Sequence, residues 1–173
     1  MLMNAGSAVL LLVDLQERLV PAMHDGERVV ARAARLAEAA TLLEVPVLAT
    51  EQVPEKLGPT VERLAGLPHL VMPKTRFAAD DDVLFPPGRG EIVVAGVEAH
   101  VCVLQTVLEL LADDRRVVLV ADAVGSRFVE DEQLALQRAR AAGAEIVTSE
   151  MVLFEWLRDA AHPRFREVQK LLK

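Results

Sequence analysis

Three residues of different chemical types stand at the ends of apolar stretches of the sequence. Asp14 ends the run SAVLLLVD, Lys74 ends the run HLVMPK, and Cys102, the only cysteine of the 173 residues, follows the run EIVVAGV. Brought together, a carboxylate, an ammonium group and a thiol form an acid–base–nucleophile set. In such a set the carboxylate takes the proton of the thiol, and the cation makes two neighbouring negative groups tolerable.

The position of Cys102 leads us to expect a reactive thiol. A free thiol has a pKa of about 8.5 and is mostly protonated at neutral pH. The start of a helix and a neighbouring ammonium group both favour the thiolate, so we expect them to lower the pKa of Cys102. An ionised Asp14 nearby would raise that pKa, so its useful role is to accept the proton.

Each of the three residues also has a simpler interpretation when it is taken alone. A lone cysteine is often buried only because it packs well. Asp14 could cap a short helix that runs through Met23, and Lys74 could be a solvated loop lysine. The hypothesis of a site therefore rests on the combination of the three, because independent placement of all of them at strand ends is much less probable.

The segments that must position these residues alternate between strand-like and helix-like patterns. Helical spacing of apolar residues appears between the strands, and Gly143 is placed to end one helix with a left-handed cap. The expected helices are residues 27–43, 102–112, 131–142, 149–158 and 163–172. The expected strands are residues 7–14, 45–50, 69–74, 91–97, 116–124 and 144–149.

Most of the expected strands are continuous apolar blocks, which is typical of strands that are covered on both faces. Strands that alternate with helices predict a doubly wound α/β sheet with parallel strands. Ligands of such sheets bind beyond the carboxyl ends of the strands. Asp14, Lys74 and Cys102 are therefore expected to lie at one edge of the sheet.

Length and composition narrow the classes of protein and partner. A chain of 173 residues fits one domain, residues 1–173, that buries its own core. The net charge of −7 and an aromatic content of 3% disfavour nucleic acids and anionic membrane surfaces. The first residues lack a basic leader, and a single unpaired cysteine fits a reducing compartment. We expect a cytoplasmic protein whose partner is a small molecule.

The motifs around the three residues identify a family. The sequence resembles the isochorismatase-like cysteine hydrolases through LLLVDLQ, with Asp14 and Gln16, through MPKTRFAA, with Lys74 and Phe77, and through VVAGVEAHVCVLQT, with Cys102. The resemblance covers essentially the whole chain. It implies a three-layer α/β/α fold with a six-stranded parallel sheet in the order 3-2-1-4-5-6, and an Asp–Lys–Cys triad.

The resemblance also implies how a substrate would be held. A cis peptide bond between Val97 and Glu98 would aim the N–H of Glu98, along with that of Cys102, at one substrate oxygen. Two backbone donors of this kind stabilise a developing oxyanion. The predicted residues of the substrate pocket are Gln16, Gln52 and Phe77.

The sequence departs from some branches of the family. Nicotinamidases bind a metal after the second strand, but the corresponding segment TEQVPEKLGPT contains no histidine, and the four histidines have no ligand spacing. We therefore predict no metal and no cofactor, as in the small, metal-free isochorismatase-domain proteins. The resemblance favours a homo-oligomer, although the apolar stripe of the last helix could equally pack on its own domain. That stripe comprises Phe165, Val168, Leu171 and Leu172.

The predicted function is hydrolysis of a small amide, carbamoyl or related carbonyl compound through a thioester on Cys102. The alternative is a non-catalytic protein on the same fold that binds a small molecule or a partner. A nucleotide-binding domain is disfavoured, because the first strand is followed by DLQERLVPAM, which has no glycine-rich phosphate loop.

Overall fold

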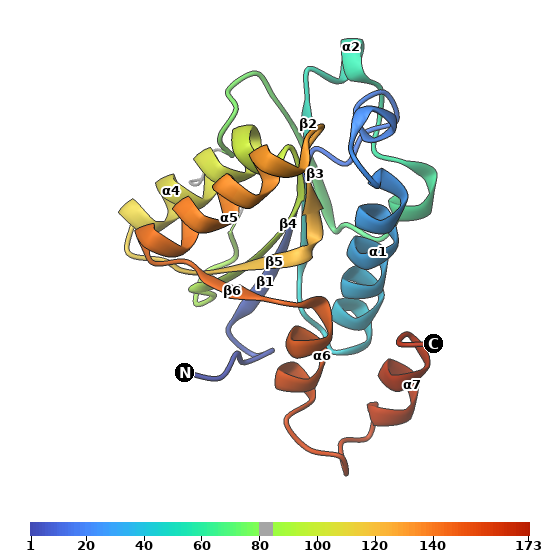
Figure 1. Cartoon of the computed structure of the whole chain (residues 1–173). Helices are drawn as coiled ribbons and strands as arrows, with labels where there is room; N and C mark the ends of the chain where they lie inside the picture. The colour runs from blue at the N-terminus through green and yellow to red at the C-terminus, as the bar shows by residue number, and fades with distance from the viewer. Residues whose placement is uncertain (80–84) are drawn as a thin grey trace.

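The structure is a computed structural model, and it describes residues 1–79 and 85–173. Six strands form one sheet in the order β3-β2-β1-β4-β5-β6, and each pair of neighbours is parallel (Figure 1). This confirms the predicted fold class and strand order. The strands are β1 (Ala8–Val13), β2 (Val47–Gln52), β3 (Leu70–Lys74), β4 (Glu91–Val97), β5 (Arg116–Gly125) and β6 (Glu145–Val147).

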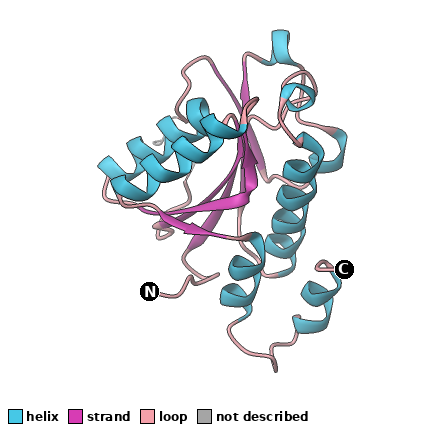
Figure 2. Cartoon of the chain, viewed as in Figure 1, coloured by secondary structure: helices cyan, strands magenta, loops and turns pink. Residues whose placement is uncertain are grey.

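Helices cover both faces of the sheet, which gives the predicted three layers (Figure 2). One layer consists of α1 (Gly26–Leu42), α6 (Ser149–Leu157) and α7 (Phe165–Lys170), which contact one another. The other layer consists of α4 (Leu104–Ala112) and α5 (Val129–Ala142). Figure 1 shows that the sheet lies between the two layers.

Alternate residues of β1 belong to different apolar clusters. Leu10 and Leu12 lie in the cluster beneath α1, whereas Val9 and Leu11 lie in the cluster beneath α4 and α5. Every residue of β1 is buried because the strand is covered on both faces. Burial on both faces, which the sequence predicts, therefore explains why this strand is a continuous apolar run.

The boundaries differ from the predicted ones by a few residues, and some short elements were not predicted. β2 ends two residues later than expected, and Gly143 takes the predicted left-handed cap with a φ of 113°. Short turns lack the several periods of apolar spacing by which a helix is recognised. The additional elements are the helix α2 (Pro54–Leu57), the 3-10 turn Glu62–Leu64, and a π-helical turn, Ala99–Val103. Where a short helix capped by Asp14 was the alternative, the structure has a 3-10 turn, Val20–Ala22, whose N-cap residue is Leu19.

The apolar stripe near the end of the chain packs on the rest of the protein. Val168 is fully buried in the cluster beneath α1, and Phe165, Leu171 and Leu172 pack against that cluster. Of the two explanations for this stripe, the structure supports packing within the chain. None of the helices in residues 1–79 and 85–173 is long and apolar enough to cross a membrane.

Candidate active site

Asp14 is the first polar residue beyond β1, and its carboxylate is fully buried. Its backbone has a φ of 51°, in the left-handed region that Asp and Asn adopt more readily than most residues. Thr50 Oγ1 donates to Asp14 Oδ1 over 2.7 Å, and Lys74 Nζ donates to Asp14 Oδ2 over 2.7 Å. The buried charge is thus compensated by one cation and one hydroxyl group.

Lys74 reaches Asp14 across the carboxyl end of the strand that separates them. Because β2 lies between β1 and β3, the Lys74 side chain must extend over the end of β2. Only 6% of that side chain is exposed. Its ammonium also donates to Gln52 Oε1 over 2.7 Å and to the carbonyl oxygen of Phe77 over 2.8 Å.

Cys102 approaches this pair from the other side of β1. It lies on the π-helical turn Ala99–Val103, which follows β4, the other neighbour of β1. The residue is 5% exposed and packs in an apolar cluster. Its sulfur nevertheless lies close enough to Asp14 and Lys74 for both side chains to act on the pKa of the thiol. The structure therefore brings the three predicted residues into one buried cluster, which we call the Asp–Lys–Cys cluster.

The pKa of Cys102 corrects one expectation from the sequence. Burial, and after it the negative charge of Asp14, raise the pKa of this thiol to about 12, although Lys74 acts in the opposite direction. The sequence argument predicted a lowered pKa because it could not weigh desolvation against the nearby cation. At pH 7 only about one sulfur in 10⁵ is then a thiolate. Reaction at Cys102 therefore requires a base that removes the proton.

The backbone between β4 and the π-helical turn has the geometry that the family resemblance implies. The peptide bond between Val97 and Glu98 is cis, and Glu98 immediately precedes the turn. Gly96 has a φ of 133°, and a Cβ atom there would lie 2.1 Å from the carbonyl oxygen of Val13. Only glycine therefore allows β4 to approach β1 this closely just before the turn that carries Cys102.

The three residues predicted to line the substrate pocket have different surroundings. Gln16 is fully buried, and its amide binds the backbone of Gln52 and Gly58. Gln52 is 8% exposed and binds Lys74, whereas 51% of Phe77 is exposed. These contacts give both glutamines a role in holding the site together. Their contact with a substrate stays a prediction.

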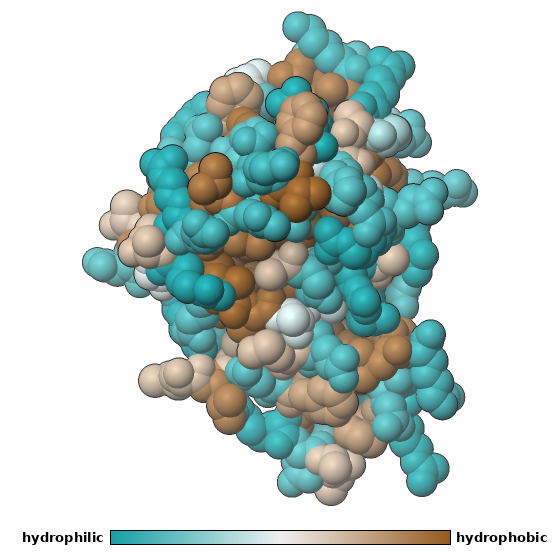
Figure 3. Space-filling view, viewed as in Figure 1, coloured by the Kyte–Doolittle hydropathy of each residue, from teal (hydrophilic) through white to brown (hydrophobic). Residues whose placement is uncertain are grey.

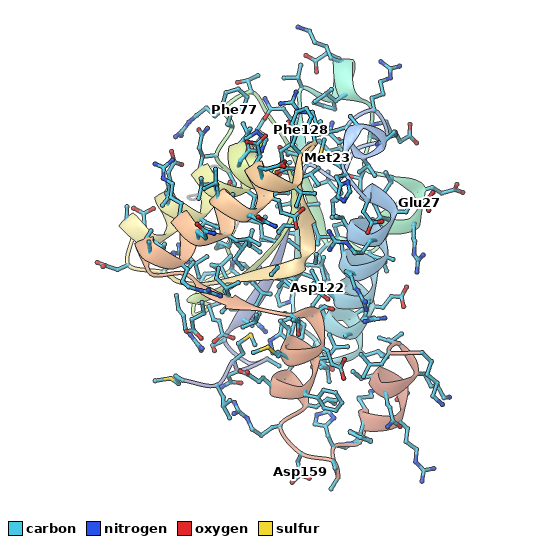
Figure 4. The ribbon with its side chains drawn as sticks, in the orientation of Figure 1. Met23, Glu27, Phe77, Asp122, Phe128 and Asp159 are labelled. Atoms are coloured by element: carbon cyan, nitrogen blue, oxygen red, sulfur yellow. The ribbon has the colours of Figure 1, made fainter. Side chains whose placement is uncertain are left out.

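Two exposed aromatic rings lie at one end of the molecule. Phe77, after β3, and Phe128, just before α5, lie at the end of the molecule opposite Asp159 (Figure 4). Phe77 and Phe128 are 51% and 61% exposed. A hollow of about 340 Å³ lies nearby, between the segments that follow β2 and β3, and Lys74 is part of its wall along with Glu55 and Arg76. Of the Asp–Lys–Cys cluster, Lys74 is the member that borders this space.

Sequence reasoning missed two threonines that support the site. Thr50, at the carboxyl end of β2, binds Asp14 and could have been noticed as a polar residue that interrupts an apolar run at a strand end. Thr106, in α4, donates from Oγ1 to the Cys102 carbonyl oxygen over 2.7 Å and accepts from the N–H of Ala79 over 3.0 Å. No local pattern predicts the second contact, because Ala79 belongs to a different segment.

Replacing Thr106 by valine should destabilise the protein by about 1–3 kcal/mol, because the buried N–H of Ala79 would lose its acceptor. Thr41→Val, at an exposed position, controls for loss of the bond within the helix alone, since Thr41 Oγ1 donates to the Ala37 carbonyl oxygen over 2.9 Å and has no such second contact. Urea unfolding measures both changes. Equal losses of stability in the two variants would show that the bond to Ala79 contributes nothing.

Three of the four histidines bind protein groups through a ring nitrogen. His69 Nδ1 accepts from the N–H of Val47, His162 Nδ1 accepts from the N–H of Arg164, and His100 Nδ1 pairs with Ser126 Oγ. In the part of the chain that the structure describes, no three His, Cys, Asp or Glu side chains group in a way that could hold a metal ion.

Comparisons with known proteins identify the family and the fold of the chain. A family model for the isochorismatase domain matches residues 8–151. Isochorismatase domain-containing protein 2 of Homo sapiens is 40% identical over 172 residues, which cover 97% of this chain and 84% of that protein.

Among solved structures, a MAR1 ribonuclease from Caenorhabditis elegans superimposes with a TM-score of 0.92 at 34% identity, covering 99% of this chain and 92% of that one. The YcaC gene product of Escherichia coli, described as an octameric hydrolase of unknown specificity, has a TM-score of 0.80 at 23% identity. That match covers 98% of this chain and 95% of the other. At this level of identity, the likeness to YcaC shows a shared fold.

Proposed function

The chain belongs to the isochorismatase family, and we propose that it is a cysteine-dependent hydrolase of a small amide, carbamoyl or related carbonyl compound. The observation that carries this proposal is the Asp–Lys–Cys cluster at the carboxyl edge of the sheet. A thiol, a carboxylate and an ammonium group gathered at one buried site provide a nucleophile, a base and a charge that compensates both. The fold itself is a hydrolase fold, and the site supplies the chemistry.

The first half of the proposed reaction forms a thioester. Asp14 accepts the proton of Cys102 as the sulfur attacks the carbonyl carbon, and the carbonyl oxygen becomes an oxyanion. The N–H groups of Glu98 and Cys102 donate to this oxyanion. When the tetrahedral intermediate collapses, the bond between carbon and nitrogen breaks, and Asp14 returns the proton to the departing amine or ammonia.

The second half regenerates the thiol. Asp14, again a carboxylate, takes a proton from a water molecule, and the resulting hydroxide attacks the thioester carbon. The bond between carbon and sulfur breaks, the product leaves as a carboxylic acid, and the sulfur recovers a proton from Asp14. Lys74 stays charged throughout and lowers the energy of each state in which negative charge lies on Asp14 or on the sulfur.

A panel of small amides and carbamoyl compounds tests the proposal. Turnover of an amide should release ammonia or an amine and the matching carboxylic acid in equal amounts, as detected by an ammonia assay and mass spectrometry. Turnover of a carbamoyl compound should release ammonia or an amine together with CO2, because the carbamic acid that forms decomposes. Binding without release of either product, for every member of the panel that binds, would overturn the hydrolase proposal.

One observation favours the alternative of a non-catalytic binding protein. A thiol that is 5% exposed and has a pKa raised to about 12 is almost entirely protonated at neutral pH, so only a small fraction of it is available as a nucleophile. The same panel separates the two proposals, since calorimetry detects binding of compounds that are not turned over.

Because the similar C. elegans protein is described as a ribonuclease, cleavage of RNA is a further activity to test. We expect no cleavage of RNA by this chain, because its net charge of −7 repels phosphate backbones and its aromatic content of 3% leaves few rings for stacking bases. A labelled single-stranded RNA belongs in the panel. Its cleavage would overturn the prediction that the partner is a small molecule.

We also propose that the chain is a single domain, that the protein is cytoplasmic and that it forms a homo-oligomer. The E. coli protein, which is described as octameric, supports the last of these three proposals. Apolar side chains lie in patches among hydrophilic ones on the viewed face (Figure 3). Phe128, Leu134 and Phe154 are among the large apolar residues that are exposed. Covering such side chains favours association. Light scattering should give a mass above that of the 18.9 kDa chain, and a monomer at micromolar concentration would contradict this.

A further inference from the structure

The amide of Gln52 connects the ammonium group of Lys74 to the backbone beyond β3. Gln52 Oε1 accepts from Lys74 Nζ over 2.7 Å, and Gln52 Nε2 donates to the carbonyl oxygen of Thr75 over 2.8 Å. Gln52 is 8% exposed and the Lys74 side chain 6%, so water competes little for either contact. The amide therefore has one orientation in which both its oxygen and its nitrogen are satisfied.

The hydrogen-bond capacity of Lys74 explains what this contact does. An ammonium group has three N–H donors. Three acceptors lie within 2.8 Å of Lys74 Nζ, namely Asp14 Oδ2, Gln52 Oε1 and the carbonyl oxygen of Phe77. With one donor on Gln52 and one on Phe77, the third must point at Asp14. Lys74 then acts on the reaction through its charge and through its bond to Asp14.

Gln52 is held in turn by Gln16. The N–H of Gln52 donates to Gln16 Oε1 over 2.7 Å, and Gln16 Nε2 donates to the carbonyl oxygens of Gln52 and Gly58 over 3.1 Å and 2.7 Å. The fully buried side-chain amide of Gln16 thus binds both the N–H and the carbonyl oxygen of Gln52, as the backbone of a neighbouring strand does in a sheet. It also holds the segment that follows β2 through Gly58.

We infer that Gln52, held by Gln16, is a positioning residue that fixes the ammonium group of Lys74 on Asp14, where its charge acts on the sulfur of Cys102. The consequences for turnover rest on the proposed function, but the position of the charge beside the sulfur does not. Without the Gln52 acceptor, one N–H of Lys74 would lose its buried partner. The ammonium would turn or move toward other acceptors, such as the carbonyl oxygen of Arg76 at 3.3 Å.

Alkylation of Cys102 by iodoacetamide tests this without any substrate. Lys74 favours the thiolate of Cys102, so its displacement should lower the fraction of thiolate. Gln52→Leu should alkylate roughly three- to tenfold more slowly than the wild type at pH 8.5, since one pKa unit corresponds to a tenfold change. Gln105→Leu, at an exposed position of α4, is the matched control and should alkylate at the wild-type rate.

Two further variants distinguish positioning from general loosening of the site. Gln16→Leu should slow alkylation in the same direction, and the double variant Gln16→Leu/Gln52→Leu should be no slower than Gln52→Leu, because both act through one chain of contacts. Urea unfolding curves identify variants that do not fold. If Gln16→Leu or the double variant does not fold, the alkylation rate of Gln52→Leu alone tests the inference.

The outcomes separate this inference from the proposed function. If Gln52→Leu alkylates at the wild-type rate whereas Lys74→Met is slowed, the inference is overturned whether or not a substrate is known. If alkylation is slowed as expected but no amide is turned over, the positioning role stands and the hydrolase proposal fails. For any substrate that is found, Gln52→Leu should lower kcat and leave KM within about twofold, because the positioning role of Gln52 is exerted through Lys74. A KM raised by as much as kcat is lowered would instead support the predicted contact of Gln52 with substrate.

Discussion

Asp14→Asn is expected to reduce turnover by about 10²–10⁴-fold and, in the same protein, to make Cys102 more reactive toward iodoacetamide. Turnover falls because the amide of asparagine cannot accept the proton of the thiol. Reactivity rises because the negative charge of Asp14 is one of the causes that raise the pKa of Cys102. Asparagine keeps the shape of the residue and also tolerates the left-handed backbone at this position.

The pH dependence of alkylation shows why the rate should rise, and not fall, in Asp14→Asn. Below a pKa of about 12, the alkylation rate of the wild-type thiol should rise about tenfold per pH unit, because the thiolate is the reactive form. Removing the charge of Asp14 lowers that pKa, so the variant should react faster at every pH between 7 and 10. Mass spectrometry measures alkylation, and Asp113→Asn, at an exposed position after α4, is the control. Parallel losses of turnover and alkylation would show that Asp14 only maintains the structure.

Lys74→Met is expected to lower the free energy of unfolding by about 3–5 kcal/mol. The fully buried Asp14 carboxylate would keep Thr50 but would lose the cation bound to its Oδ2 atom. An uncompensated buried charge is costly because neither water nor a counter-ion stabilises it. Methionine preserves most of the length of the lysine side chain, so loss of packing contributes little.

A double variant tests whether the charge is the cause. In Lys74→Met/Asp14→Asn there is no buried charge to compensate, so the double variant should be more stable than Lys74→Met alone. Urea unfolding at pH 7 gives the three free energies, and Lys56→Met, at an exposed position of α2, should be near neutral. A double variant whose loss equals the sum of the two single losses would mean that the two side chains do not interact.

The sequence predicted well which strands form the site and which residues stand at their ends, because both depend on local patterns. A strand covered on both faces needs a continuous apolar run, and the first polar residue beyond it, Asp14, must then lie at the edge of the sheet. The run HLVMPK likewise predicted Lys74 at the end of a strand, and Lys74 is the last residue of β3, although this edge strand is largely exposed. The strand order, which brings these ends together, came from the resemblance to a family and not from the apolar runs themselves.

The electrostatics of the site could not be predicted in the same way. The pKa of Cys102 depends on how much water the fold removes from the sulfur, and a sequence shows that a helix begins nearby without showing how deeply it is covered. The role of Gln16 was missed for a related reason. The partners of its amide are backbone groups of Gln52 and Gly58, whose positions are set by the irregular segment after β2.

Intact-protein mass spectrometry under single-turnover conditions tests the central claim most directly. With a substrate found in the amide panel, the wild-type protein should gain the mass of the acyl group on Cys102 within the first turnover and lose it as the acid appears. Asp14→Asn should show neither step on this timescale. Formation of the acid with no acyl adduct on Cys102 at any time, even when the reaction is trapped by rapid acid quench, would contradict nucleophilic attack by this sulfur.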